Sequence, residues 1–198
     1  MTTNRIEAFS DGVIAIIITI MVFDLKVPEI AGGIHSGNAW QVLFMLLPKF
    51  VSYLISFVIL AIMWINHHEM FRHINHANVI LLWLNNLLLF CMSLIPFSTN
   101  FIGANPFLPE AELFYGLIFF ANSLSFWLLR NYAIKAKLTH ERISEKTKER
   151  IRIKNFIAIG IYLISAFTGY LSTYISFILY LIVPIIYFIP EKITTNET

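Results

Sequence analysis

Long apolar stretches alternate with short polar segments along most of the chain. These stretches cover about residues 5–27, 40–66, 78–96, 110–135, 153–169 and 174–189. A helix that crosses a bilayer needs roughly 20 mostly apolar residues, and the stretches approach or exceed that length. The pattern therefore predicts an all-α fold with six membrane-spanning helices in one domain over residues 1–198. Gly169 and the polar pair Ser172–Thr173 form the break between the last two stretches, so this division is the least distinct.

The composition explains where these apolar side chains must go. Hydrophobic residues make up 58% of the chain and charged residues 13%, against about 45–50% and about 25% in soluble domains. A chain of this size cannot bury the excess in its own core, so we expect a polytopic membrane protein surrounded by membrane lipids. The net charge of +2 gives no reason to expect a nucleic-acid partner, and the single cysteine, Cys91, excludes an intrachain disulfide.

Lys and Arg are distributed unevenly between the loops. If both termini are cytoplasmic, every basic residue except Lys26 and Lys49 falls on the cytoplasmic side. Cytoplasmic loops of membrane proteins are enriched in Lys and Arg, so the sequence predicts a cell-membrane protein with both termini in the cytoplasm. The densest basic region, residues 130–154, also contains interleaved glutamates. This mixture favours a short solvated helix over Glu145–Arg150 rather than a specific lipid site.

Histidines gather near the end of the second apolar stretch. The group comprises His67, His68, Glu69, His73 and His76. On a helix, Glu69, His73 and His76 share a face, which a metal site could use. However, the spacing from His68 through Glu69 to His73 is one residue longer than the H-E-x-x-H pattern of zinc hydrolases. Because a His-rich segment beside a membrane is usually solvated, we expect no bound metal and no cofactor.

The first apolar stretch starts with charged residues and has two distinct faces. Arg5, Glu7 and Asp11 lie at its start, and helical periodicity puts Glu7 and Asp11 on one face. Such groups usually face protein or water. Deeper in the helix, a separate stripe is formed by Ile16, Thr19, Ile20 and Phe23. Apolar stripes are also normal on packed or lipid-facing helices, so periodicity alone does not assign this stripe to a pore.

Two short motifs indicate a known family. The motif Arg5-x-x-x-Phe9-Ser10-Asp11, followed by Ile16-x-x-Thr19, resembles the first helix of the bacterial branch of the transmembrane protein 175 family of potassium-permeable cation channels. The element Trp64-x-x-His67-His68 is also similar to that family. The resemblance implies a homotetramer with four first helices around a central pore. It also implies that K⁺ permeates without a re-entrant filter loop.

The resemblance further implies roles for single residues of the first helix. The narrow hydrophobic constriction corresponds to Ile16, and the filter threonine corresponds to Thr19, one turn further out. Ile20 and Phe23 correspond to additional apolar layers of the pore. The phenylalanine departs from the leucine expected in the family, which leaves the width of the outer constriction open.

Physical chemistry is compatible with such a pore. A ring of Ile16 side chains would exclude hydrated ions by dewetting, and the Thr19 hydroxyls would replace part of the hydration that an entering ion loses. Potassium sheds water more readily than sodium, so we expect a weak preference for potassium. The alternative for Thr19 is a hydroxyl that bonds the backbone of its own helix, which is common.

The charged start of the first helix predicts an anchoring network. Asp11 lies off the stripe and, if buried, needs polar partners. Arg5 is poorly placed to pair with it in the same helix, so contact through another helix or subunit is expected. We predict a network of Arg5, Ser10, Asp11 and either His67 or His68, which fixes the first helix or gates the pore. A histidine beside a carboxylate would make conductance respond to pH between roughly 5 and 8.

Three other classes of function are alternatives to a passive cation channel. A secondary transporter usually has internal repeats and a helix broken at mid-depth, and neither is evident in the sequence. A proton-permeable channel needs a chain of titratable groups, and the segment Gly12–Phe23 contains none. A membrane enzyme needs a nucleophile with its base or a pair of carboxylates, and only the histidine group offers candidates, so we expect no enzymatic activity.

Overall fold

The computed structural model describes residues 3–27, 33–35, 37–139 and 145–187. These residues form α1 (Thr3–Ile20), the 3₁₀ turn η1 (Met21–Asp24), α2 (Ala39–Arg72), α3 (Val79–Ser93), α4 (Ile95–Ala104), α5 (Pro109–Lys135), α6 (Glu145–Thr168) and α7 (Thr173–Tyr187). Within these ranges the extended structure is limited to an isolated bridge between Ile74 and Thr139.

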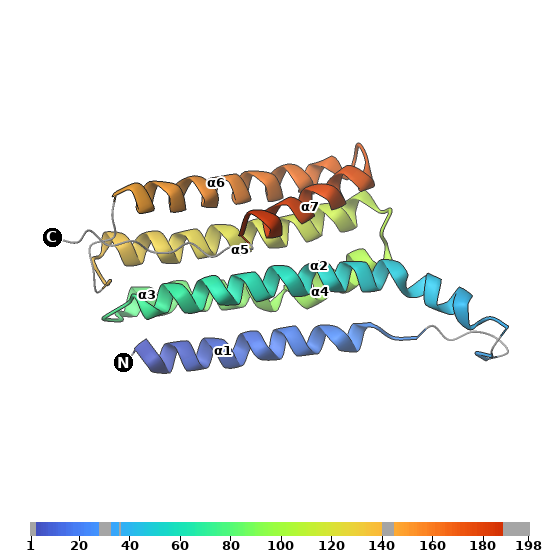
Figure 1. Cartoon of the computed structure of the whole chain (residues 1–198), viewed down its shortest axis with the longest axis horizontal. Coiled ribbons are helices and arrows are strands. Elements are labelled where there is room, and N and C mark those ends of the chain that lie inside the picture. Colours follow the sequence, from blue (N-terminus) through green and yellow to red (C-terminus); the bar gives the residue numbers. More distant parts are fainter. Residues whose placement is uncertain (1–2, 28–32, 36, 140–144, 188–198) are drawn as a thin grey trace.

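The helices run side by side in an elongated bundle. Figure 1 shows α1 along one edge, α2 with α3 and α4 next to it, then α5, and α6 with α7 at the opposite edge. Helix α1 packs against α2, α3 and α4, whereas α5 packs against α3, α4, α6 and α7. The start of α1, the end of α2, the end of α5 and the start of α6 lie at one end of the bundle.

The helix lengths agree with six membrane spans. Five spans are long and apolar enough to cross a bilayer, with α1 joined to η1 and α3 joined to α4. Helix α7 is a shorter apolar helix of 15 residues, or roughly 22 Å. By the same measure, the 34 residues of α2 extend for roughly 50 Å, well beyond a hydrocarbon core of about 30 Å. The chain is an all-α polytopic membrane protein, as the sequence predicted.

Several helix boundaries differ from the prediction. The first span was predicted as one helix over 5–27, but its α-helix ends at Ile20 and continues as η1. The second was predicted to end at residue 66, but α2 continues to Arg72. The polar residues at its end extend the helix beyond the apolar stretch, so hydropathy alone does not mark this part of α2.

The third and fifth predicted spans also change. The third was predicted to stop at residue 96, but a new helix, α4, begins there, with Pro96 in its first turn, where the missing N–H of proline is tolerated. The fifth was predicted to start at residue 153, after a separate charged helix. Instead, α6 is continuous from Glu145, and a 2.7 Å ion pair between Lys148 and Glu145 supports its first turn.

Aromatic packing around α5 forms the core of the bundle. The Tyr115 ring lies 4.7 Å from Phe119 and 5.0 Å from Tyr180, between ring centroids. The Tyr180 hydroxyl donates to the carbonyl of Glu112 at 2.9 Å. Because Gly116 has no side chain, α5, α6 and α7 approach closely beside this cluster. A Cβ at position 116 would lie 2.6 Å from both the Ala166 Cβ and the Tyr180 hydroxyl.

Substitution Gly116→Ala is expected to destabilise the protein. The added methyl would also lie 2.7 Å from the Cα of Ala166, so backbone must move, at about 1–3 kcal/mol for an overpacked site. Thermal unfolding in detergent should show a lower Tm than wild type. Gly160→Ala is the matched control because a Cβ there meets nothing within 4 Å. Equal Tm values for the two variants would contradict the close packing of α5 on α6.

Candidate functional site

Helix α1 divides into a buried face and an exposed face. Ile6, Ser10, Ile14 and Ile17 are buried against the bundle. The predicted stripe lies on the other side: Ile16 is 58% exposed, Ile20 46% and Phe23 71%, and Thr19 is exposed with them. Because α1 is an edge helix (Figure 1), this whole stripe is available to face another subunit, lipid or water.

The hydroxyl of Thr19 is oriented by its own helix. It donates to the carbonyl of Ala15 at 2.9 Å and to that of Ile16 at 3.0 Å. This backbone contact is the common alternative to a filter role for a threonine within a helix. A hydroxyl has one proton but two lone pairs, so this contact leaves the Thr19 oxygen able to accept or coordinate. The backbone contact and a ligand role are therefore compatible.

The far end of α1 is held by a polar contact. Asp24 ends η1, and its carboxylate accepts a 2.8 Å hydrogen bond from the Asn100 amide of α4. Phe23, the most exposed of the stripe's apolar residues, lies in this 3₁₀ turn rather than in regular α-helix. A 3₁₀ turn has 3.0 residues per turn, so the direction of Phe23 differs from that expected for an uninterrupted α-helix.

A buried hydrogen-bond chain joins α1 to α2 and α3. The His67 Nε2 lies 2.9 Å from the Asn85 Oδ1, and the Asn85 amide donates to the Ser10 hydroxyl at 2.9 Å. Ser10 in turn donates to the carbonyl of Ile6 at 2.8 Å. Since the Asn85 oxygen can only accept, His67 carries its proton on Nε2. His67 and Ser10 are 0% exposed and Asn85 is 1% exposed, so this chain is shielded from solvent.

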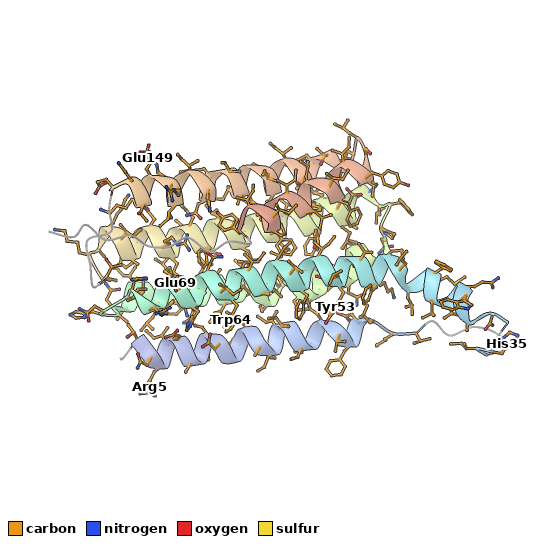
Figure 2. The ribbon with its side chains drawn as sticks, viewed as in Figure 1. Arg5, His35, Tyr53, Trp64, Glu69 and Glu149 are labelled. Atoms are coloured by element: carbon orange, nitrogen blue, oxygen red, sulfur yellow. The ribbon has the colours of Figure 1, made fainter. Side chains whose placement is uncertain are left out.

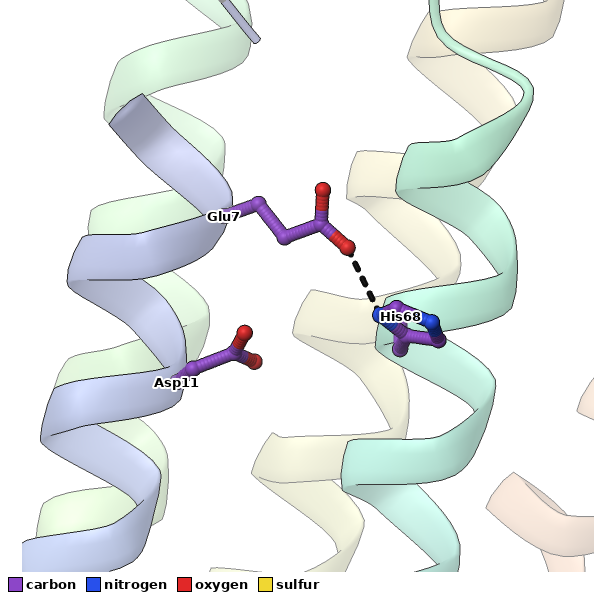
Figure 3. A group of neighbouring side chains, drawn as sticks. All are labelled: Glu7, Asp11 and His68. Carbon is purple, nitrogen blue, oxygen red and sulfur yellow. Dashed lines mark ion pairs between the residues drawn. The ribbon is translucent and has the colours of Figure 1, made fainter. Parts of the chain in front are cut away.

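A second polar group lies nearby, between the charged start of α1 and α2. The Glu7 carboxylate lies 2.7 Å from the His68 Nδ1, and the Trp64 indole donates to Asp11 at 2.9 Å. Figure 3 shows Glu7 and Asp11 one above the other on α1, with both carboxylates directed toward His68. The rings of Trp64 and His68 are stacked with centroids 6.2 Å apart. Asp11 therefore has a neutral donor as its partner rather than a cation.

The predicted network is thus only partly assembled within one chain. Ser10 joins His67 through Asn85, whereas Asp11 lies with His68, so both histidines are used, in different groups. Arg5 is exposed and makes no hydrogen bond or ion pair with the described residues of its own chain. Figure 2 shows Arg5 on the outer side of α1, away from the other helices. Its pairing with a neighbouring subunit stays a prediction, and the exposed ring of Phe9 lies on the uncovered surface as well.

The predicted histidine group does not gather around one point. His67 is directed into the core, and Glu69 bonds Arg72 at 3.2 Å and His73 at 3.3 Å on the surface. Among the described residues, the side chains that converge closely enough to bind one metal ion are instead Glu7, Asp11 and His68.

Sequence reasoning missed one residue of the site and the partner of another. Asn85 was not singled out, although a pair of asparagines, Asn85 and Asn86, within an apolar stretch is a signal of a buried polar contact. Trp64 was named as part of the family motif, but its indole hydrogen bond to Asp11 was not predicted. Neither partner follows from local periodicity, because both contacts join residues far apart in the sequence.

Comparison with known proteins gives consistent matches. The family model described as "Endosomal/lysosomal potassium channel TMEM175" matches residues 5–96. A protein of Chryseobacterium sp. named as a potassium channel is 37% identical over 192 residues, which cover 97% of this chain and 95% of that protein. The human protein named "Endosomal/lysosomal proton channel TMEM175" is 30% identical over 118 residues, or 57% of this chain and 23% of that much longer protein.

A solved structure supports the fold across nearly the whole chain. The crystal structure of a lysosomal potassium-selective channel TMEM175 homolog from Chamaesiphon minutus aligns with a TM-score of 0.81 at 28% identity. The alignment covers 93% of this chain and 95% of that one. The helical bundle with α1 at its edge therefore has the same fold as that channel.

Loss of the Asn85 side chain should weaken the attachment of α1. Asn85→Ala leaves the buried His67 Nε2 and Ser10 hydroxyl without their shared partner, which should lower the free energy of unfolding by about 1–3 kcal/mol. In thermal unfolding, Asn86→Ala is the control because Asn86 is exposed, and its effect should stay below about 0.5 kcal/mol. If the two variants unfold alike, the buried chain does not stabilise the subunit.

Proposed function

The chain belongs to the TMEM175 family of potassium channels, and we propose that it forms a weakly selective, potassium-permeable pore lined by α1. The observation that carries this proposal is the stripe of Ile16, Thr19, Ile20 and Phe23, which the rest of the subunit leaves uncovered. Helix α1 is held in one rotation by the buried chain to Asn85 near one end and by Asn100 at the other, so every subunit would present the same stripe.

The proposed assembly is a homotetramer. Four copies of an edge helix can meet at one axis while α2 to α7 surround them, so that each subunit contributes the same stripe to the centre. A closed symmetric ring is the usual way in which identical subunits bury one shared surface. The remaining exposed apolar side chains, such as those of α6 and α7 at the far edge, would then face lipid.

The narrowest part of the proposed pore is a ring of Ile16 side chains. Ile16 lies four residues before the end of α1, on the exposed face. Four branched aliphatic side chains around a narrow axis exclude water, and an ion cannot cross a dry segment without losing hydration. A small outward movement of α1 would wet this ring, so gating needs no separate plug. Ile20 and Phe23 would form further apolar layers toward the other mouth.

Thr19 is the proposed selectivity element. Its hydroxyl proton is engaged by the carbonyls of Ala15 and Ile16, so an oxygen lone pair can be presented to the axis. Four such oxygens would replace part of the hydration shell, and the ion with the less costly dehydration, K⁺, would pass more easily than Na⁺. Neutral hydroxyls are weak ligands compared with carboxylates, so a modest preference is expected.

The proposed membrane orientation places both termini in the cytoplasm of the cell. The bundle end that holds Arg5 also holds Arg72, Lys135 and the charged start of α6. Lys26 and Lys49, the only two basic residues predicted to lie outside, belong to the loop and helix at the opposite end. This asymmetry supports the positive-inside orientation for a multi-pass protein.

A proton-permeable channel is the second candidate, because the human relative is named as a proton channel. The stripe of α1 between Gly12 and Phe23 has no titratable side chain, so protons would have to move along water rather than along a side-chain relay. A secondary transporter is less well supported. Its binding sites use broken helices, whereas α1 is regular through Ile16, Thr19 and Ile20 and passes directly into η1. The break at Leu94 lies between α3 and α4.

Substitution Ile16→Asn tests the constriction. A polar ring should stay wet, so K⁺ flux into liposomes should rise roughly tenfold if wetting removes about 1.4 kcal/mol of barrier. Ile164→Asn is the matched control, since Ile164 is 59% exposed but lies on α6 at the other edge. If the Ile16→Asn variant forms an intact tetramer but conducts K⁺ at the wild-type rate, Ile16 does not form the constriction.

Substitution Thr19→Ala tests the selectivity element. Loss of the hydroxyl ligand, worth about 0.5–1.5 kcal/mol, should lower the K⁺ over Na⁺ permeability ratio by about two- to tenfold. Reversal potentials under bi-ionic conditions measure this ratio, and a parallel pH gradient measures proton permeability. Thr19→Ser keeps the hydroxyl and should retain the wild-type ratio. An unchanged ratio in the alanine variant would contradict the role of Thr19.

A further inference from the structure

Three potential metal ligands converge where the start of α1 meets α2. Glu7 and Asp11 are one helical turn apart on α1, His68 comes from α2, and one ligand atom from each lies within 4.8 Å of the other two (Figure 3). We propose that Glu7, Asp11 and His68 form a binding site for a first-row divalent cation such as Zn²⁺, which bridges α1 and α2. This site is separate from the exposed stripe of α1 and does not depend on the proposed pore.

The donor set selects the class of metal. One imidazole nitrogen with two carboxylate oxygens is a combination that Zn²⁺ and related transition metals accept, with a water in the remaining position. Ca²⁺ and Mg²⁺ prefer oxygen donors alone, so His68 should discriminate against them. Metal–ligand bonds of about 2.0–2.2 Å put neighbouring ligand atoms roughly 3.3–3.5 Å apart. The present spacings, 2.7 Å for Glu7 to His68 and up to 4.8 Å for the set, bracket that separation.

The side chains have room for this adjustment. The His68 side chain is 46% exposed and the Glu7 side chain 20% exposed, so a cation can enter from solvent and small rotations suffice. Without a metal, the Glu7 carboxylate and the His68 Nδ1 form a 2.7 Å ion pair. A bound cation would replace this direct contact, because each metal ligand must offer a lone pair to the ion.

The surroundings of the ligands provide independent support. The Trp64 indole donates to the Oδ1 of Asp11 at 2.9 Å, and a ligating carboxylate is typically held by such an outer hydrogen bond. Stacking of the Trp64 ring on His68 restricts the imidazole. Within the described part of the chain, neither carboxylate is paired with a lysine or an arginine, and the partner of Glu7 is the ligand His68 itself. The two carboxylates can therefore balance the charge of a divalent cation.

A metal here would connect two helices that are otherwise joined by side-chain hydrogen bonds. Ligands on α1 and α2 would be held at coordination distance, so the start of α1 could not separate from α2 while the ion is bound. The ordinary alternative is a solvated Glu7–His68 ion pair beside an Asp11–Trp64 hydrogen bond, with no affinity for metals. The metal site and this alternative predict different results when the full-length protein is titrated with a divalent cation.

Isothermal titration of the detergent-solubilised full-length chain with ZnCl₂ tests the site. We expect one Zn²⁺ per subunit and no comparable binding of Mg²⁺. His68→Gln and Glu7→Gln should each weaken Zn²⁺ binding at least tenfold. His73→Gln is the matched control, because His73 also contacts a glutamate, Glu69, from the same helix, and none of the described residues adds a third ligand there. Size-exclusion chromatography establishes that each variant keeps the wild-type assembly.

Wild-type protein alone provides a second measurement if a variant fails to assemble. Co²⁺ bound by one nitrogen and two carboxylates with a water should give the intense visible absorption of a four-coordinate ion, and Zn²⁺ should displace it. Weak absorption typical of hydrated six-coordinate Co²⁺ would overturn the proposal. It would also be overturned by equal binding of Mg²⁺, or by Zn²⁺ affinity that is retained in His68→Gln or lost equally in His73→Gln.

Discussion

A buried hydrogen-bond chain from His67 through Asn85 to Ser10 determines how α1 is attached to the subunit. In the interior of a membrane protein there is no water to satisfy these groups, so each must find a protein partner. The chain can form only if Ser10 faces α3, and on a rigid helix this fixes the direction of every other side chain of α1. The stripe that begins at Ile16 is exposed as a direct consequence.

The attachment of α1 is polar at its ends and apolar in between. The pairs of Glu7 with His68 and of Asp11 with Trp64 act at the start, and the Asn100 contact to Asp24 acts at the end. Between them, Ile14 and Ile17 pack against the bundle. This arrangement holds α1 in one rotation about its axis but leaves room for small shifts of the helix between its ends. Directional contacts specify the rotation, whereas apolar contacts between the ends tolerate small shifts.

The other half of the bundle has a different character. Helices α5, α6 and α7 are joined by close packing at Gly116 and by the aromatic cluster of Tyr115, Phe119 and Tyr180. Few hydrogen bonds are needed where helices approach this closely, because van der Waals contacts between complementary surfaces fix their positions. The subunit thus combines a rigid scaffold, distant from α1, with an edge helix that is held by a small number of specific hydrogen bonds. In the proposed pore, this division would separate the helices that support the pore from the helix that lines it.

The sequence by itself determined the class of protein, the apolar stretches and the two faces of α1, because hydropathy and helical periodicity are local properties. The motif around Ser10 and Asp11 also identified the family. Local patterns did not predict that α3 ends before Pro96 or that Trp64 binds Asp11, and they did not separate the roles of His67 and His68. Tertiary structure decided these points. The Asn85–Ser10 hydrogen bond joins positions 75 residues apart, and its partners are selected by how three helices pack, which no single stretch of sequence encodes.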